Sequence, residues 1–161
     1  MESEISTLML KREGEQKGVG KRILLVEDDF FVRDIYQKKL TDEGFTVDSA
    51  GNGLEGLDRL KEHIPDLMLL DMFMPYVDGK DVLLEMRQHE EWKDIPVILL
   101  TNLADNEGVR FGFGQGVEEF LIKSHFTPSE VVQKICAVLE RHAKHGILPE
   151  EDAEKNGHTE K

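Results

Sequence analysis

Short apolar runs separated by longer stretches of helical spacing dominate the pattern of this chain. The runs that begin at Ile23, Leu67 and Val97 contain four apolar residues each without interruption, which is typical of strands buried on both faces of a parallel sheet. Segment 45–50 alternates between apolar and polar residues, and a further apolar segment precedes Lys123. We therefore expect five strands, at 23–26, 45–50, 67–70, 96–100 and 117–122.

Apolar residues at helical spacing fill the first three intervals between these strands. Gly44 and Pro65 are expected to end the first two helices, and Asn52 to cap the second. The predicted inward faces are Val32, Ile35, Tyr36 and Leu40 in the first helix, Leu54, Leu57, Leu60 and Ile64 in the second, and Val82, Leu83 and Met86 in the third.

The last two helices differ in expected stability. The helix predicted from Leu103 to Gln115 contains or borders three glycines, and an interior glycine costs about 1 kcal/mol relative to alanine. The final helix begins with a capping box, in which Thr127 precedes Pro128 and Glu130 follows. Cys136 falls in its apolar pattern as a small core residue. We expect the glycine-rich helix to be the least stable.

The alternation of strands and helices predicts one doubly wound α/β domain, with a parallel sheet covered by helices on both faces. The usual strand order for this count is 2-1-3-4-5, with a crevice beyond the carboxyl ends of strands 1 and 3. We expect the domain to span residues 21–142. A flexible tail is expected at 1–20 and a polar, acidic tail at 143–161.

The composition of the chain limits which partners it can bind and where in the cell we expect it. The formal net charge is −13, and residues 21–142 contain 24 acidic and 14 basic residues, a balance of −10. Such a field opposes binding to nucleic acid or to an anionic membrane. The chain shows no apolar run long enough to cross a bilayer and no secretory pattern, and its single cysteine excludes an internal disulfide. We expect a cytoplasmic protein.

Polar residues follow the ends of four predicted strands. Glu27 and Asp28 follow the first, Asp71 the third, Thr101 the fourth and Lys123 the fifth. In isolation, Asp71 would be interpreted equally well as a strand-end cap. The strand order places all five at one edge, where close carboxylates repel one another unless a hard cation such as Mg²⁺ or Mn²⁺ binds. A metal-bound carboxylate can attack phosphorus and form an aspartyl phosphate.

These motifs together resemble the receiver domain of two-component response regulators. They are LLVEDD at 24–29, LLDMFMP at 69–75 followed by Asp78-Gly79, then Thr101, then FLIK at 120–123. The resemblance covers about 21–142 and implies a flavodoxin-like (CheY-like) fold. Receiver domains are an established example of the 2-1-3-4-5 order, so this expectation rests partly on the resemblance.

The resemblance implies roles for the acidic residues. Asp71 matches the phosphoacceptor, and Glu27 and Asp28 match the acidic pair that holds Mg²⁺. Asp28 is expected to be the direct ligand and Glu27 to act through water, with the backbone carbonyl of Phe73 as a further ligand. Asp29, one residue past the pair, is expected to cap the first helix.

The same resemblance implies a phosphorylation switch. Lys123 matches the lysine that binds the phosphoryl group, and Thr101 and Phe120 match the switch pair. The implied partners are a sensor histidine kinase or a histidine phosphotransfer protein, and a downstream protein or phosphorelay. The switch surface comprises the helix at 103–115, the strand at 117–122 and the last helix. On this interpretation the chain is a single-domain regulator, whose only chemistry is its own phosphorylation and dephosphorylation.

Two positions depart from the family pattern, and two more bear on the expected lifetime of the phosphoryl group. Ser124 replaces a proline that usually follows the lysine through a cis peptide, which without proline costs about 3–4 kcal/mol; either the fold imposes it or the loop differs. Asn102 replaces a small residue. Phe73 and Leu103 match the two positions that flank the approach of water in this family. Both are apolar and cannot orient an attacking water, so we expect a long-lived aspartyl phosphate.

Other functions remain open from the residues. Taken singly, Thr101 fits a strand end, Phe120 a core residue and Lys123 a solvated charge. A receiver-like interaction module that is never phosphorylated is the main alternative. An aspartyl phosphohydrolase is disfavoured, because Phe73 occupies the position of its general acid. A flavin carrier is disfavoured because acids, not Ser, Thr and Gly, follow the first strand.

Overall fold

The computed structural model describes residues 18–102 and 106–159, with side chains left out at 106–109 and 144–159. Five parallel strands form one sheet in the order β2-β1-β3-β4-β5, as predicted. The strands are β1 (Arg22–Val26), β2 (Thr46–Ala50), β3 (Leu67–Leu70), β4 (Val97–Thr101) and β5 (Glu119–Ile122). The described helices are α2 (Phe30–Asp42), α3 (Gly53–Glu62), α4 (Gly79–Gln88), α5 (Asn106–Gly114), α6 (Pro128–Thr159) and the short 3₁₀ turn η1 (Lys123–His125).

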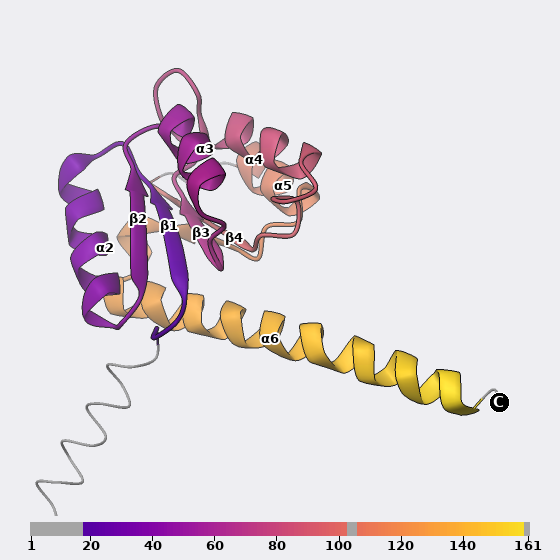
Figure 1. Ribbon diagram of the computed structural model, residues 1–161. Helices are drawn as coiled ribbons and strands as arrows, with labels where there is room; N and C mark the ends of the chain where they lie inside the picture. Colours follow the sequence, from indigo (N-terminus) through magenta and orange to yellow (C-terminus); the bar gives the residue numbers. More distant parts are fainter. Residues whose placement is uncertain (1–17, 103–105, 160–161) are drawn as a thin grey trace, which may run out of the picture.

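Helices cover both faces of the sheet (Figure 1). Alternate residues of a strand point to opposite faces, so Ile23 and Leu25 pack with α2 and α6, whereas Leu24 and Val26 pack with α3 and α4. The two cores are therefore separated by the sheet itself. This arrangement explains why β1, β3 and β4 are apolar along almost their whole length.

Most helix ends lie where the sequence predicts them. Asp29 caps α2, because its Oδ1 accepts hydrogen bonds from the backbone N–H groups of Phe31 and Val32 at 2.9 and 3.1 Å. Gly44 follows α2 with a φ of 97°, which favours glycine. Asn52 caps α3, and Thr127 and Glu130 form the predicted capping box of α6. These local signals depend on neighbouring residues only, which is why they are visible in the sequence.

Three residues that we predicted to be buried are exposed. Ile35 is 52% exposed, Leu54 60% and Ile64 53%. α2 turns Tyr36 and Leu40 inward, and Ile35 lies about 100° away from Tyr36 around the helix. α3 ends at Glu62, so Ile64 lies outside it, and the buried residues near its start are Gly53 and Gly56 rather than Leu54.

Parts of both segments that we predicted to be tails have regular structure. Residues 18–20 form a turn, in which the Gly18 N–H donates to the Glu43 carbonyl at 3.0 Å; residues 1–17, also predicted to be a tail, lie outside the described residues. α6 continues through 143–159 and projects beyond the sheet (Figure 1). Among the residues of α6 whose side chains are described, the buried ones lie between Val131 and Val138, before this projection. No helix in the described part of the chain is both long and apolar enough to cross a membrane.

Candidate phosphoacceptor site

The carboxyl edge of the sheet brings the predicted site residues together. Val26 pairs with Leu70 in the register, so the residues that follow β1 and β3 emerge side by side. β4 and β5 end on the same edge, with Thr101 paired to Ile122. A cleft of about 260 Å³ opens there, lined by Glu27, Asp28, Asp29, Asp71, Phe73, Thr101, Asn102 and Lys123.

Lys123, which follows β5, forms buried ion pairs with acids that follow β1 and β3. Its Nζ donates to both carboxylate oxygens of Glu27 at 2.7 Å and to Asp71 Oδ2 at 3.4 Å. Glu27 is only 2% exposed, so the ammonium neutralises a charge that water does not reach. The described residues contain no cis peptide bond, and Lys123 begins the turn η1. The loop without proline therefore places the lysine in the cleft through a trans peptide to Ser124.

Asp71 lies in an environment that favours its protonated form. Its side chain is nearly inaccessible, and burial together with the nearby Glu27 carboxylate raises the pKa of Asp71 from 3.8 to about 7. Lys123 and the backbone N–H of Phe73, which donates to Asp71 Oδ1 at 3.1 Å, partly oppose this rise. The ionised form of Asp71 is therefore unfavourable until a cation binds in the cleft.

Three carboxylates are placed as a cation site requires. Glu27, Asp28 and Asp71 each offer an oxygen, and these atoms lie within 4.8 Å of one another. Asp28 is exposed and the other two are buried. Hard divalent cations prefer such oxygen ligands, and Mg²⁺ usually keeps several waters and takes only one or two carboxylates directly. The donor set therefore fits Mg²⁺ or Mn²⁺.

Two glycines set the position of the loop that follows Asp71. A Cβ atom at Gly79 would lie 2.7 Å from the Asp71 carbonyl oxygen and 2.8 Å from Met72 Cα. A Cβ atom at Gly53 would clash with the Val77 carbonyl oxygen. The first residues of α4 and α3 thus lie in close contact with the backbone of the loop. A side chain at Gly79 or Gly53 would displace that backbone. The sequence marks Gly79 only as a turn residue.

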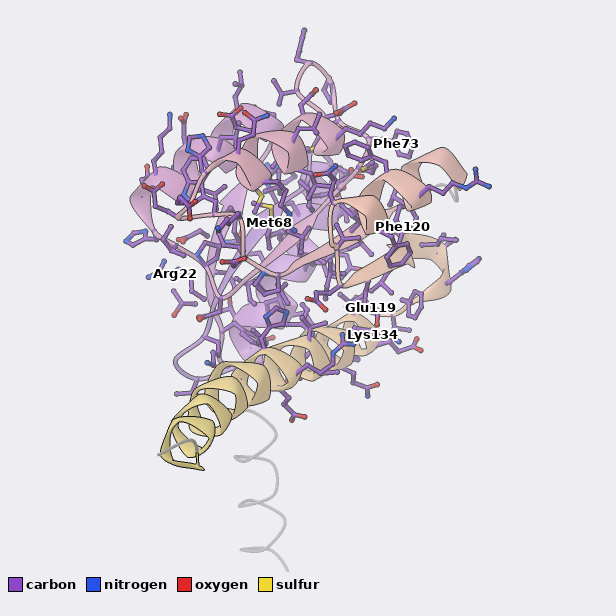
Figure 2. All side chains as sticks on the ribbon, turned by 90° about the vertical axis from the view of Figure 1, so that its right-hand side faces the viewer. Arg22, Met68, Phe73, Glu119, Phe120 and Lys134 are labelled. Atoms are coloured by element: carbon purple, nitrogen blue, oxygen red, sulfur yellow. The ribbon has the colours of Figure 1, made fainter. Side chains whose placement is uncertain are left out.

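The predicted switch pair is divided between the cleft and the core. Thr101 is fully buried, and its Oγ1 has no hydrogen-bond partner among the described residues. Phe120 does not line the cleft; it is partly buried against the core beneath α3, α4 and α5. In the view of Figure 2, Phe73 appears above α5 and Phe120 below it. Thr101 therefore adjoins the acids, whereas Phe120, in β5, packs against the core and is not among the residues that line the cleft.

Two residues at this edge were not assigned to the site from the sequence. Asp29 lines the cleft as well as capping α2. Arg33 Nη1 donates to the carbonyl oxygen of Glu27 at 2.7 Å. A third consecutive acid is a visible signal for Asp29. Nothing in the spacing of polar residues along a helix distinguishes Arg33 from a solvated surface arginine.

Comparisons with known proteins agree on one family. The family model described as "Response regulator receiver domain" matches residues 23–136. A probable transcriptional regulator ycf27 from Cyanidium caldarium is 36% identical over 132 residues, which cover 82% of this chain and 51% of that protein. The DNA-binding dual master transcriptional regulator RpaA from Synechocystis is 34% identical over 120 residues, covering 74% of this chain and 49% of that protein. The chain thus spans about half the length of these curated relatives.

Solved structures share the fold over nearly their whole length. A CheY-like receiver domain protein from Methanospirillum hungatei superimposes with a TM-score of 0.73 at 27% identity, covering 78% of this chain and 98% of that one. A putative response regulator from Chloroflexus aurantiacus gives a TM-score of 0.69 at 30% identity, covering 74% and 98%.

Proposed function

The chain belongs to the response regulator receiver domain family of two-component systems, and from this premise we propose that Asp71 accepts a phosphoryl group from a phosphohistidine. The donor is a sensor histidine kinase or a histidine phosphotransfer protein. One observation carries the proposal: three carboxylates and the Lys123 ammonium share one cleft at the carboxyl edge of the sheet. For the residues that the structure describes, we propose no chemistry beyond this phosphorylation and its reversal.

The residues that would hold Mg²⁺ are Asp28, Asp71 and the backbone carbonyl of Phe73, with Glu27 acting through water. When bound, the cation neutralises the carboxylates and the negative charge on the phosphoryl oxygens. The three acids bring oxygen ligands from two adjacent strands into range of one ion. This supply of oxygen donors, with no cysteine or histidine among the described residues that line the cleft, supports Mg²⁺ or Mn²⁺ rather than zinc.

The transfer itself requires one nucleophile. A carboxylate oxygen of Asp71 attacks the phosphorus atom, a new P–O bond forms, and the P–N bond of the phosphohistidine breaks with its electron pair remaining on the imidazole nitrogen. Lys123, already within reach of Asp71, exchanges part of its contact with Glu27 for the phosphoryl oxygens. Asp71 must be ionised to attack, so neutralisation of the cleft is also what activates it.

Thr101 and Phe120 are proposed to transmit the change. Thr101 Oγ1 has no hydrogen bond to give up among the described residues, so a new bond to a phosphoryl oxygen would be a net gain. Phosphorylation shifts a two-state equilibrium only through contacts that differ between the states. We propose that this gain moves Thr101 inward, lets Phe120 turn, and alters the surface of α5, β5 and α6.

The output is proposed to pass through that surface to a protein partner or a phosphorelay. The balance of −10 in residues 21–142 opposes direct contact with nucleic acid. RpaA is described as DNA-binding, and this chain matches about half of its length. That share corresponds to a receiver domain, so a DNA-directed output would need the part of the relatives that this match does not cover.

A receiver-like module that is never phosphorylated is the second candidate. The observation that favours it is Asn102, whose larger side chain lines the cleft where the family usually has a small residue. A crowded cleft would reduce the space for a phosphoryl group. The two candidates differ in a single measurable property, which is the covalent gain of that group.

The test is the intact mass of the protein after incubation with acetyl phosphate and Mg²⁺, beside an Asp71→Ala variant. We expect a gain of one phosphoryl group that requires both Mg²⁺ and Asp71. No gain in folded protein, by acetyl phosphate or by a phosphorylated kinase, would contradict the proposal and favour the interaction module. Binding of the phosphoryl mimic beryllofluoride then shows whether the cleft admits such a group at all.

A further inference from the structure

Arg33 forms hydrogen bonds to two backbone carbonyl groups of the acidic segment that follows β1. It is the fourth residue of α2, and its Nη1 donates to the Glu27 carbonyl oxygen at 2.7 Å. Its backbone N–H donates to the Asp29 carbonyl oxygen at 2.9 Å. One residue thus holds the backbone on both sides of Asp28. Hydrogen bonds from a guanidinium are among the stronger ones in proteins, because the donor is charged.

Neighbouring groups fix where this guanidinium lies. Its Cζ is 5.7 Å from the centroid of the Phe30 ring. A Cβ atom at Gly51 would lie only 3.0 Å from Nη1, so the loop after β2 borders it closely. The Glu27 backbone N–H in turn donates to the Ala50 carbonyl oxygen at 3.0 Å. The peptide groups on both sides of the Glu27 Cα therefore have defined partners.

Asp28 depends on this backbone more than the other two acids do. Glu27 is held by Lys123, and Asp71 accepts from the backbone N–H of Phe73. For the Asp28 carboxylate, no hydrogen-bond donor or cation lies within bonding distance in the part of the chain whose side chains are described. Its direction is consequently set by the backbone from Glu27 to Asp29, which Arg33 holds.

We propose that Arg33 is a positioning residue for the cation site: it fixes the peptide between Glu27 and Asp28, and so directs the Asp28 carboxylate toward the cation that it shares with Asp71. The inference rests on the proposed function, because it requires a divalent cation among these acids. Arg33 contacts neither the cation nor the reacting atoms. Its effect reaches the site only through the backbone of its neighbour.

Arg59 provides a matched control for a purely structural role. It also lies on a helix, α3, and its Nε donates to a strand carbonyl, that of Ser49, at 3.2 Å. Both arginines therefore tie a helix to the backbone of the sheet. Only Arg33 does so at the peptide next to a cation ligand, so only Arg33 should affect the cation.

The experiment measures Mg²⁺ binding by isothermal titration calorimetry, without any phosphodonor, on the full chain. We expect Arg33→Ala to weaken the affinity about tenfold, the lower end of the range for the loss of a partner that orients a metal ligand. Arg33→Lys should recover part of it, because an ammonium also donates to a carbonyl. Arg59→Ala should stay within about twofold of the parent. Thermal midpoints in EDTA establish that each variant is folded, and Arg33→Gln replaces the alanine variant if that one is not.

Phosphorylation by acetyl phosphate gives an independent readout. The Mg²⁺ concentration for half-maximal rate should rise about tenfold in Arg33→Ala, while the rate at saturating Mg²⁺ stays within about twofold. An unchanged affinity in folded Arg33→Ala overturns the inference. So does an equal loss in Arg33→Ala and Arg59→Ala that follows their thermal midpoints. A parent that binds Mg²⁺ but gains no phosphoryl group refutes only the proposed function, since calorimetry still decides the role of Arg33; a parent that binds no Mg²⁺ overturns both.

Discussion

Burial opposes the ionisation of Asp71, and this opposition predicts the direction in which stability changes with pH. The pKa of Asp71 is about 7 in the folded protein against 3.8 ordinarily, so between these values the folded state binds more protons than the unfolded state. The free energy of unfolding of the metal-free protein should therefore fall as pH rises from about 4 through 7. Asp71→Asn removes the charge, and we expect it to stabilise the protein at pH 8 by about 1–3 kcal/mol, with little effect near pH 4.

Urea unfolding in EDTA at both pH values measures this difference. Asp58→Asn is the matched control, because Asp58 is a largely exposed acid on α3, away from the cleft. A gain from Asp71→Asn that is the same at pH 4 and pH 8 would show that charge is not its cause. Added Mg²⁺ should stabilise the parent more than the variant, because the cation offsets the same repulsion.

Phe73 leads to a second prediction, on the lifetime of the phosphoryl group. Its side chain is 46% exposed and lines the cleft, so an apolar ring borders the approach of water to Asp71. A ring cannot orient water for attack. The double variant Phe73→Asn, Leu103→Glu supplies polar groups, although Leu103 lies outside the described residues. We expect it to lose the phosphoryl group at least about tenfold faster, as followed by intact mass.

Leu54→Asn is the control for this variant, since it makes another exposed apolar residue polar at a distance from Asp71. It should lose the phosphoryl group at the parental rate. If the double variant also decays at that rate, water access is controlled by another part of the cleft.

Sequence and structure agree best on where residues lie when those residues directly follow an apolar run that forms a strand. Asp71, Thr101 and Lys123 could be located because each follows a buried apolar run, and the topology then brings them together. Arg33 could not be located, because its contact depends on how a long side chain crosses from a helix to a carbonyl. The pairing of Lys123 with Glu27 was likewise invisible, since 96 residues separate them.

At the scale of the element, two of the three glycines in α5 have opposite roles. A Cβ atom at Gly112 would lie 2.7 Å from Leu99 Cδ1, so the missing side chain lets the helix approach β4. At Gly114 a Cβ atom would meet no described atom within 4 Å. We expect Gly114→Ala to raise the free energy of unfolding by about 0.5–1 kcal/mol and Gly112→Ala to lower it by about 1–3 kcal/mol.

Urea unfolding measures both changes, and hydrogen exchange locates them. The amides of α5 should exchange faster than those of the first half of α6 in the parent, and Gly114→Ala should slow them selectively. Equal protection of the two helices in the parent would refute the idea that α5 is the loose element of the proposed switch.

The elements themselves were predictable to within a few residues, but their inward faces were only partly so. Periodicity placed Tyr36 and Leu40 correctly and Ile35 wrongly, because Ile35 lies about 100° from Tyr36 around the helix and only Tyr36 is turned into the core. Ile64 was wrong because the helix stops before it. Close contacts made by Gly53 and Gly79 were beyond prediction, since they depend on the path of the chain between α3 and α4.

At the scale of the molecule, one sheet explains both the fold and the site. Parallel strands bring all their carboxyl ends to one edge, and the 2-1-3-4-5 order sets β1 beside β3. The acids that follow these two strands are thereby adjacent, although 43 residues separate Asp28 from Asp71 in the chain. The strand order was predicted from the count of elements and the family resemblance together, whereas the extension of α6 beyond residue 143 was not predicted.

That extension gives the final prediction, which concerns the boundary expected at residue 142. Among the described side chains of α6, the buried ones are Val131, Val132, Ile135 and Val138, and these precede the part that projects beyond the sheet (Figure 1). A chain that ends after Ala143 should therefore unfold within about 1 kcal/mol of the full chain, because no described core contact is lost. Val138→Ala in the full chain should cost on the order of 2 kcal/mol, because it removes buried methyl groups. Urea unfolding decides between these expectations: a truncated chain that loses as much stability as Val138→Ala would show that residues 144–161 belong to the folded domain.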